Sequence, residues 1–419
     1  MQIIVFEDEL VARLYPVAIG KPVYAVGCGS YRLVDWLTEL AERHKAHLRG
    51  IVRPHLATIQ HVDFPQLASI AANGELPALL VNARMVPSVS AWKSLAQLIA
   101  DGRSGAVLQG SSLAAAYIAE PNPAPPAHAD GTRLQEYLQH LVLHRLPVLD
   151  HRLPLFEYPH DLIRYNLAII SESLDHRIAS GRFEEQRPGV FVAPGATLGE
   201  YCVTDTSKGP VLLDENASVG PHSFLRGPAY LGPRARVTEQ SAIKDAVALG
   251  HTTKIGGEVE ASIVEPYTNK QHYGFLGHSY LGSWINLGAG TCNSDLKNTY
   301  GNVRMDYRGE SVATGMQFVG CMMGDYAKSA INTGIFTGKT IGVCSMVYGF
   351  VTTNVPSFVN YARLFGQVTE LPAEVMIATQ QRMFARRNVI QRPCDAQLIH
   401  DMYELTRHER QLAGEPLQL

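Results

Sequence analysis

Two polar segments interrupt the glycine-rich second half of the chain, and they carry side chains that could exchange protons or bind a polar ligand. The first is Tyr267-Thr268-Asn269-Lys270-Gln271-His272, and the second extends from Asn293 to Asn302. Between them, Asn286 places an amide at a position where amides are unusual. Imidazole exchanges protons near neutral pH, and loops on rigid scaffolds are where sites are built. These segments are therefore the first candidates for a functional site.

The segments interrupt a sequence repeat with a period of six residues. Four residues after each aliphatic position of this repeat stands a small or β-branched residue. The spacing also occurs upstream at Val192 and returns later at Phe275 and at Ile335. The aliphatic positions of the longest uninterrupted stretch are Leu213, Val219, Leu225, Leu231, Val237, Ile243, Leu249 and Ile255.

A six-residue period indicates a β-helix, in which each hexapeptide forms one short strand and one corner. The aliphatic residue points into a narrow core, and neighbouring coils pair about 4.8 Å apart as strands of a sheet do. One coil cannot bury its own core, so only a stack of coils is stable. A β-sandwich would instead show alternation with a period of two. Crossover connections are generally right-handed, and the period alone does not decide the hand of this coil.

The rest of the chain is predicted to form an α/β domain and two helical regions. Alternating apolar runs and amphipathic stretches favour a βαβ sheet near the N-terminus, followed by a proline-rich segment and then by helical periodicity. Near the C-terminus, Arg386 and Arg387 could bind phosphate, although a solvated helix face is the commoner explanation. The predicted boundaries are 1–130 for the α/β domain, 131–188 for a helical bridge, 189–360 for the β-helix and 361–419 for C-terminal helices. A fragment from about Ser180 to the C-terminus is expected to fold alone.

Charge and composition disfavour several classes of partner. The net charge of −3 favours small molecules over nucleic acid or an anionic membrane. No apolar run reaches the roughly 20 residues of a membrane span, and no signal peptide is expected. Six scattered cysteines without CxxC spacing are typical of free thiols in the cytoplasm. Three further histidines, His222, His251 and His278, match no zinc-ligand pattern, so no metal site is predicted there.

The region around the two polar segments resembles the acetyltransferase signature of GlmU-type bifunctional enzymes. It reads His272-Tyr-Gly-Phe-Leu-Gly277, Leu281-Gly282, Ile285-Asn286-Leu-Gly-Ala-Gly290 and Cys292-Asn293. A histidine followed fourteen residues later by the asparagine of an N-[IL]-G-A-G motif is the family's spacing. The longer string from Gly277 to Asn298 is more similar still to a divergent GlmU-like subgroup. The resemblance implies a left-handed β-helix, acetyl-CoA as co-substrate and a homotrimer with sites between subunits.

The resemblance also implies roles for individual residues. His272 would be the general base that takes a proton from the substrate amine. Asn286 and Asn293 would hold the sugar, and Gly288-Ala289-Gly290 would let the backbone approach the pantetheine arm. Two residues differ from those of the family. Phe275 stands where the family has a tyrosine, and Glu260 stands where it has a lysine that contacts the sugar phosphate. The candidates to substitute for that lysine are Lys244, Lys254 and Lys270.

The N-terminal region is similar to sugar-phosphate nucleotidyltransferases at Arg13-Leu14-Tyr15-Pro16 and Lys21-Pro22. In those enzymes a glycine turn cradles the nucleotide phosphates, whereas this chain has Glu7, Asp8 and Glu9 there. Arg84 stands where the family has a metal-binding aspartate. The resemblance implies nucleotide binding through Arg13, Lys21 and Arg84, with Mg²⁺ needed if the domain is active.

Three hypotheses follow. The first is an N-acetyltransferase for an amino sugar phosphate resembling glucosamine-1-phosphate, fused to a domain resembling UDP-N-acetylglucosamine pyrophosphorylase, in the synthesis of cell-envelope precursors. The second is a regulatory or scaffolding protein with a degenerate domain that senses a sugar nucleotide. The third is an acyltransferase for a different amino sugar or sugar nucleotide.

Overall fold

The computed structural model describes residues 1–67, 76–120, 122–126, 131–144 and 146–412. The chain divides into two compact units. The first comprises residues 1–14, 21–26 and 31–157, and the second comprises residues 15–20, 27–30 and 158–419. Two short pieces of the N-terminal region therefore belong to the second unit. No helix among the described residues is long and apolar enough to cross a membrane.

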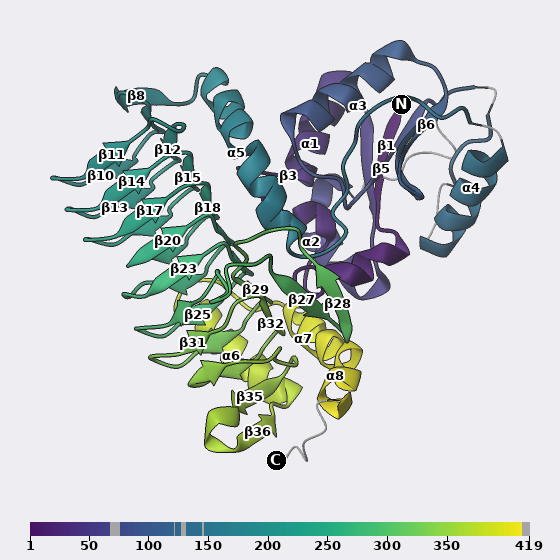
Figure 1. Ribbon diagram of the computed structural model, residues 1–419. Helices are drawn as coiled ribbons and strands as arrows, with labels where there is room; N and C mark the ends of the chain where they lie inside the picture. The colour runs from purple at the N-terminus through teal and green to yellow at the C-terminus, as the bar shows by residue number, and fades with distance from the viewer. Residues whose placement is uncertain (68–75, 121, 127–130, 145, 413–419) are drawn as a thin grey trace. The chain divides into compact units, whose positions relative to one another are not determined.

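The first unit is a five-stranded mixed sheet with helices on both faces (Figure 1). The strand order is β4 (His47–Ile51), β1 (Gln2–Phe6), β5 (Ala78–Asn82), β7 (Ser112–Ile118) and β6 (Gly105–Gln109). The first three strands are parallel, and β7 is antiparallel to both of its neighbours. The strands are almost continuously buried, as expected for a sheet covered on both faces.

Three long helices cover this sheet. One face carries α1 (Leu33–His44) and α3 (Val89–Asp101), which contact each other, and the opposite face carries α4 (Gly131–His144). Leu134, Leu138 and Leu141 of α4 share a core with Ile4 and Leu80 of the sheet. The short helix α2 (Ala57–Asp63) completes the unit. The α/β domain predicted from alternating apolar and amphipathic segments is confirmed.

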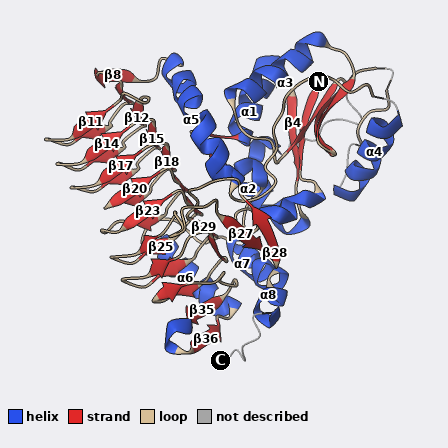
Figure 2. Ribbon diagram, in the orientation of Figure 1, coloured by secondary structure: helices blue, strands red, loops and turns tan. Residues whose placement is uncertain are grey.

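The second unit is a parallel β-helix whose strands form three faces, seen edge-on as the stack of red arrows in Figure 2. Face 1 contains β10 (Thr197–Leu198), β13 (Ser218–Val219), β16 (Arg236–Val237), β19 (Lys254–Ile255), β22 (Asn269–Lys270), β25 (Asn286–Leu287), β30 (Lys328–Ser329), β33 (Met346–Val347), β35 (Val359–Ala362) and β36 (Gln367–Glu370).

Face 2 contains β11 (Val203–Asp205), β14 (Phe224–Arg226), β17 (Ala242–Lys244), β20 (Glu258–Glu260) and β23 (Phe275–Gly277), and then a shorter sheet of β26 (Cys292–Asn293), β31 (Gly334–Ile335) and β34 (Phe350–Val351). Face 3 contains β8 (Glu184–Arg187), β9 (Val190–Val192), β12 (Val211–Leu213), β15 (Ala229–Leu231), β18 (Val247–Leu249), β21 (Ile263–Val264), β24 (Tyr280–Leu281), β29 (Cys321–Met323) and β32 (Lys339–Ile341).

The repeat positions behave as the period of six predicts. The aliphatic residues from Leu213 to Ile255 are all buried in one continuous core inside the coil. At the corners the chain enters the left-handed region of backbone conformation, at Asn216, His222, Arg234 and Gln240 among others. This region is uncommon for residues other than glycine and is tolerated best by short polar side chains. The predicted α/β domain, the parallel β-helix and the C-terminal helices are confirmed, whereas the left hand of the coil stays a prediction from the family resemblance.

Face 3 of the β-helix is covered by α5 (Asp161–Ala179). Ile170 and Leu174 of this helix pack against Leu212, Tyr230 and Ala248 of the β-helix. The predicted helical bridge thus consists of two helices, α4 in the first unit and α5 in the second. Its second half is part of the β-helix core.

The lower coils carry one insertion and a helical C-terminus. The insertion after β26 contains the antiparallel hairpin of β27 (Arg304–Tyr307) and β28 (Glu310–Ala313). The C-terminal helices are α6 (Ala373–Ala385), α7 (Pro393–Leu405) and α8 (Arg407–Leu412). Through Phe384, α6 packs on the stacked rings of Trp284 and Tyr267 at a corner of the β-helix.

Candidate functional site

His272, the predicted catalytic base, lies on an exposed corner between β22 and β23. Its backbone carbonyl accepts a hydrogen bond from Lys270 Nζ at 2.9 Å. The next residue, Tyr273, accepts one from the backbone N–H of Gly290, so this corner stacks on the predicted Gly288-Ala289-Gly290 turn. Asn286 lies on face 1 opposite Asn269, with their side-chain amides 3.4 Å apart. The structure therefore places His272 and Asn286 on adjacent coils but on different sides of a corner.

A second histidine lies one strand further along the same coil and has a carboxylate partner. His278 occupies the corner between β23 and β24, where its backbone is left-handed with φ of 44°. Its Nδ1 lies 2.8 Å from Oδ2 of Asp295, and both side chains are about 14% exposed or less. Phe318 stacks on the imidazole at 5.2 Å between ring centroids. This His278–Asp295 pair is a partly buried imidazole–carboxylate dyad, an arrangement suited to a general base.

Asn293 supports this corner from inside the coil. Its side chain is buried, its Oδ1 accepts a hydrogen bond from Gly277 N at 2.8 Å, and its Nδ2 donates one to Gly277 O at 3.0 Å. The oxygen and the nitrogen of this side-chain amide thus both hydrogen-bond to the backbone immediately before His278. A Cβ atom at Gly277 would approach Asp295 Oδ2 to 2.3 Å, so only glycine leaves room for the dyad. These contacts make Asn293 a residue that positions the corner.

Two of the three candidate lysines, Lys244 and Lys270, have partners within the β-helix. Lys244 on face 2 forms ion pairs with Glu258 and Glu260, and the hydrogen bond to Glu258 is the main reason that its pKa is raised. Lys270 is 2% exposed and donates to Gly256 O at 2.7 Å as well as to His272 O. Burial lowers the pKa of Lys270 to about 8.

The remaining predicted β-helix residues line the coil next to these groups. Phe275 is half-buried at the start of β23, and its N–H donates to Cys292 Sγ at 3.3 Å. In the glycine turn, Gly290 has a φ of 74°, and a Cβ there would meet Asn332 Oδ1 at 2.2 Å. The backbone N–H of Asn332 donates to Ala289 O at 2.7 Å. The turn is a tight stacked corner, partly open to solvent.

Four cations lie near one another, namely Arg236 and Lys254 on face 1 and Arg386 and Arg387 directly after α6. Arg236 and Lys254 are paired in register on adjacent strands, and Asn269 follows on the next. Arg387 donates a hydrogen bond to the Asn269 side chain. Burial, followed by the charges of Arg387, Arg236 and Arg386, lowers the pKa of Lys254. Mutually repelling cations of this kind favour binding of an anion such as phosphate.

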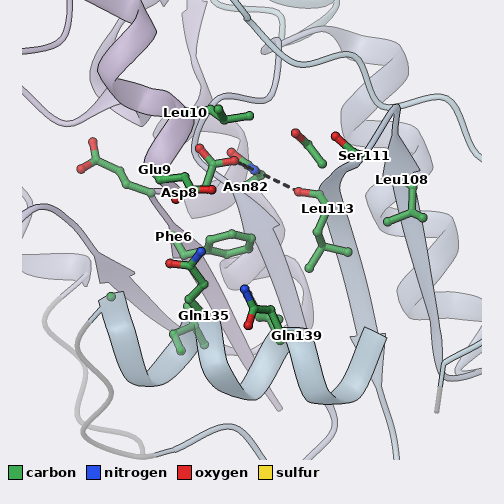
Figure 3. A pocket seen from close by; sticks show the side chains of 15 residues that line it. Phe6, Asp8, Glu9, Leu10, Asn82, Leu108, Ser111, Leu113, Gln135 and Gln139 are labelled. Carbon is green, nitrogen blue, oxygen red and sulfur yellow. Dashed lines mark hydrogen bonds between the residues drawn. The ribbon is translucent and has the colours of Figure 1, made fainter. Parts of the chain in front are cut away.

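The first unit contains a cavity of about 290 Å³ at the C-terminal ends of β1 and β5. Figure 3 shows Gln135 and Gln139 of α4 on one side and Asp8 and Asn82 on the sheet side. Ligands of open α/β sheets bind at the carboxyl ends of the strands. The cavity is therefore in the expected place, although Arg13, Lys21 and Arg84 are not among its lining residues.

Arg84 is buried behind this cavity as the partner of Asp8. The side chain of Arg84 is 1% exposed, and its Nε and one terminal nitrogen lie 2.8 and 2.6 Å from the two oxygens of Asp8. Asn82 also donates to Asp8 at 2.8 Å. Glu7 is similarly engaged, with Arg53 and with the backbone N–H of Val23. The carboxylates of Asp8 and Glu7 in the cavity wall are therefore each paired with an arginine of the same unit.

The predicted nucleotide-binding motif is divided between the two units. Arg13 is exposed on the first unit, and the carbonyl of Lys21 accepts a hydrogen bond from Arg53 at 3.3 Å. Tyr15, between them, belongs to the second unit, where its hydroxyl contacts Ser357 and Glu409.

Sequence reasoning did not pair His278 with Asp295, which the structure places 2.8 Å apart. Both residues stood in the string compared with the GlmU-type signature, but the spacing of fourteen residues to Asn286 favoured His272. A usable signal was the order glycine–histidine at Gly277-His278 followed seventeen residues later by Asp295, since one coil and its loop return the chain to the same corner.

Comparison with known proteins places these observations in a family context. A family model described as sugar nucleotidyl transferase matches residues 3–182. The bifunctional sugar-1-phosphate nucleotidylyltransferase/acetyltransferase of Sulfurisphaera tokodaii is 26% identical over 149 residues, which are 35% of this chain and 37% of that protein. The bifunctional protein GlmU of Alkalilimnicola ehrlichii is 32% identical over 125 residues, 29% of this chain and 26% of its own.

The matched regions span about a third of the length of these curated relatives, or less. Among solved structures, the UDP-N-acetylglucosamine acyltransferase of Francisella novicida aligns with a TM-score of 0.34 and 15% identity, covering 54% of this chain and 76% of that one.

Proposed function

We propose that the chain is a divergent relative of the GlmU-type enzymes that it resembles, and that its β-helix transfers an acetyl group from acetyl-CoA to the amine of an amino sugar. The observation that carries this proposal is the dyad of His278 and Asp295, with 2.8 Å between Nδ1 and Oδ2. A transferase role is what the family relationship supports most directly. The identity of the acceptor sugar, and whether it carries a phosphate, are part of this proposal.

The dyad supplies the proton chemistry of acyl transfer. A neutral imidazole that donates its Nδ1–H to Asp295 has its lone pair on Nε2. As the amine nitrogen of the acceptor attacks the thioester carbonyl, Nε2 takes one proton from that nitrogen. Collapse of the tetrahedral intermediate breaks the carbon–sulfur bond, and the imidazolium returns the proton to the departing thiolate. Asp295 fixes the tautomer and stabilises the transient imidazolium.

Acetyl-CoA carries phosphates, and we place them at the cluster of Arg236, Lys254, Arg386 and Arg387 on face 1. The dyad lies on the corner between faces 2 and 3, which in a three-sided coil is opposite face 1. One copy would therefore not offer both groups to one molecule of acetyl-CoA. This arrangement supports the predicted homotrimer, in which neighbouring copies would share sites. A monomer measured by light scattering at micromolar concentration would contradict it.

The decisive experiment compares the two histidines. Thiol release from acetyl-CoA is followed with an amino sugar and with the variants His278→Ala and His272→Ala. If the dyad is catalytic, His278→Ala lowers kcat by roughly 10²- to 10⁴-fold, while His272→Ala retains most activity. The reverse result would restore His272 as the base, and full activity in both variants would reject a histidine-based mechanism at this corner.

For the first unit, a metal-independent binding role is the second proposed function. Mg²⁺ prefers free carboxylate oxygens, but those of Asp8 are engaged by Arg84 and Asn82. These residues do not fit a metal held through Asp8. We propose that the cavity binds a sugar nucleotide without nucleotidyl transfer, the sensing role considered above.

Calorimetric titration of UDP-N-acetylglucosamine with and without EDTA tests the proposal for the first unit. Binding unaffected by EDTA is expected, together with no pyrophosphate exchange. Exchange that depends on Mg²⁺ would show an active nucleotidyltransferase instead.

A further inference from the structure

The surroundings of His278 leave one face of the β-helix open to an acceptor. On face 3, the neighbouring Ile263 and Tyr280 are 3% and 0% exposed, so that side of the corner is closed. On face 2, Glu260 is paired in register with Gly277, and its backbone carbonyl accepts a hydrogen bond from His278 N–H at 3.0 Å. An acceptor that reaches the imidazole therefore lies along face 2.

The cations of face 2 are already paired with carboxylates. Arg226 contacts both oxygens of Asp245, with Nε at 2.9 Å from Oδ1. Lys244 bonds to Glu258 and lies 3.2 Å from Glu260. Glu260 is thus both a neighbour of His278 and a partner of Lys244. A phosphate binding here would have to displace one of these carboxylates.

The total charge of this surface is also negative. Its cations are Lys208, Arg226 and Lys244, together with Lys297 on the loop that carries Asp295. Its carboxylates are Asp205, Asp245, Glu258, Glu260 and Asp295. Four positive charges, with Lys297 of the Asp295 loop included, against five negative ones leave the surface negative, which disfavours a phosphate dianion and favours a protonated amine. Arg236 and Lys254, in contrast, lie side by side on face 1.

We propose that the acceptor presents an amine and hydroxyl groups to face 2 and carries no phosphate there. The acceptor class is a neutral or cationic amino sugar, in contrast to the sugar phosphate expected from the family resemblance. Glu260 determines this specificity by holding Lys244 and by placing a negative charge one coil from His278. The inference rests on the acetyl transfer proposed above.

The first test needs no turnover, so it is independent of that activity. Equilibrium binding of glucosamine, glucosamine-1-phosphate and glucosamine-6-phosphate is measured on the full-length chain by calorimetry or saturation-transfer NMR. Glucosamine is expected to bind at least about tenfold more tightly than either phosphate ester at low ionic strength. Tighter binding of a phosphate ester, or equal binding of all three, overturns the inference.

The second test changes the charges. Replacing both carboxylates, Glu258→Gln with Glu260→Gln, releases Lys244 and should improve binding of the two phosphate esters by about tenfold relative to glucosamine. Glu239→Gln removes an exposed carboxylate at a different corner and serves as the matched control. An unchanged preference in the double variant overturns the role of Glu260. Thiol release is measured in parallel, and its absence with every acceptor rejects acetyl transfer while binding still decides the acceptor class.

Discussion

Nδ1 of His278 lies 2.8 Å from Oδ2 of Asp295, a residue seventeen positions later that returns to the same corner of the β-helix on an interrupting loop. The coil thereby brings together two groups that no local motif joins. Asn293 hydrogen-bonds to both backbone groups of Gly277, immediately before His278, so the coil itself holds the histidine of the dyad in place.

The first prediction concerns the carboxylate of this pair. Asp295→Asn keeps the shape of the side chain but presents an amide to Nδ1, which can select the wrong imidazole tautomer. We expect kcat for thiol release to fall by about 10²- to 10⁴-fold, with little change in KM for acetyl-CoA. Steady-state kinetics and a melting curve measure both effects. A variant that loses thermal stability in proportion to activity would instead indicate a structural role for Asp295.

The coil itself could be predicted from the sequence, whereas the site could be predicted only in part. A period of six residues requires stacked coils, because residues such as Leu213 and Ile255 can be buried in no other regular way. The choice between His272 and His278 depended on loop lengths that change where each corner falls. Likewise, the sequence motif around Arg13 predicted a nucleotide site, but the chain carries Tyr15 into the second unit. Such contacts between residues far apart in sequence leave no periodic signal.

The second prediction uses the buried ammonium of Lys270. Burial lowers its pKa to about 8 in the folded chain, whereas an unfolded lysine titrates near pH 10.4. Between these pH values the unfolded chain binds more protons, so Lys270 makes the free energy of unfolding rise with pH. Below pH 8 the group is protonated in both states, and the cost of burying its charge is fully present.

Urea unfolding at pH 7, 8, 9 and 10 measures this contribution as a difference between variants. Lys270→Met should be more stable relative to the parent chain at pH 7 than at pH 10. Lys208→Met, in which the replaced side chain is 62% exposed, is the control and should show no such trend. A constant difference between Lys270→Met and the parent chain from pH 7 to 10 would contradict the buried-charge interpretation.

The third prediction concerns Tyr15, which anchors an N-terminal segment in the second unit. Its hydroxyl donates to Glu409 Oε2 at 2.6 Å and lies 2.6 Å from Ser357 Oγ. Burial, followed by the charge of Glu409, raises the pKa of Tyr15 well above its ordinary value. Tyr15→Phe removes a donor from a carboxylate and should cost about 1–3 kcal/mol of unfolding free energy.

Chemical denaturation of Tyr15→Phe and Glu409→Gln separates the partners of this contact. The glutamine variant keeps an acceptor for the hydroxyl and should lose less stability than Tyr15→Phe. If both variants are as stable as the parent chain, the anchoring of residues 15–20 contributes nothing to folding.

The last prediction concerns where a stable β-helix fragment can begin. A fragment from residue 180 was expected to fold alone, but it would lack α5, whose Ile170 and Leu174 cover Leu212 and Tyr230 of face 3. Exposing the surface under two such aliphatic side chains costs roughly 3–6 kcal/mol, at about 1.5–3 kcal/mol for each. A fragment of residues 158–419 should therefore unfold cooperatively at a clearly higher urea concentration than one of residues 180–419. The full chain should exceed both, because residues 15–20 and 27–30 also belong to this unit. Equal midpoints for the two fragments would show that α5 is dispensable for the core.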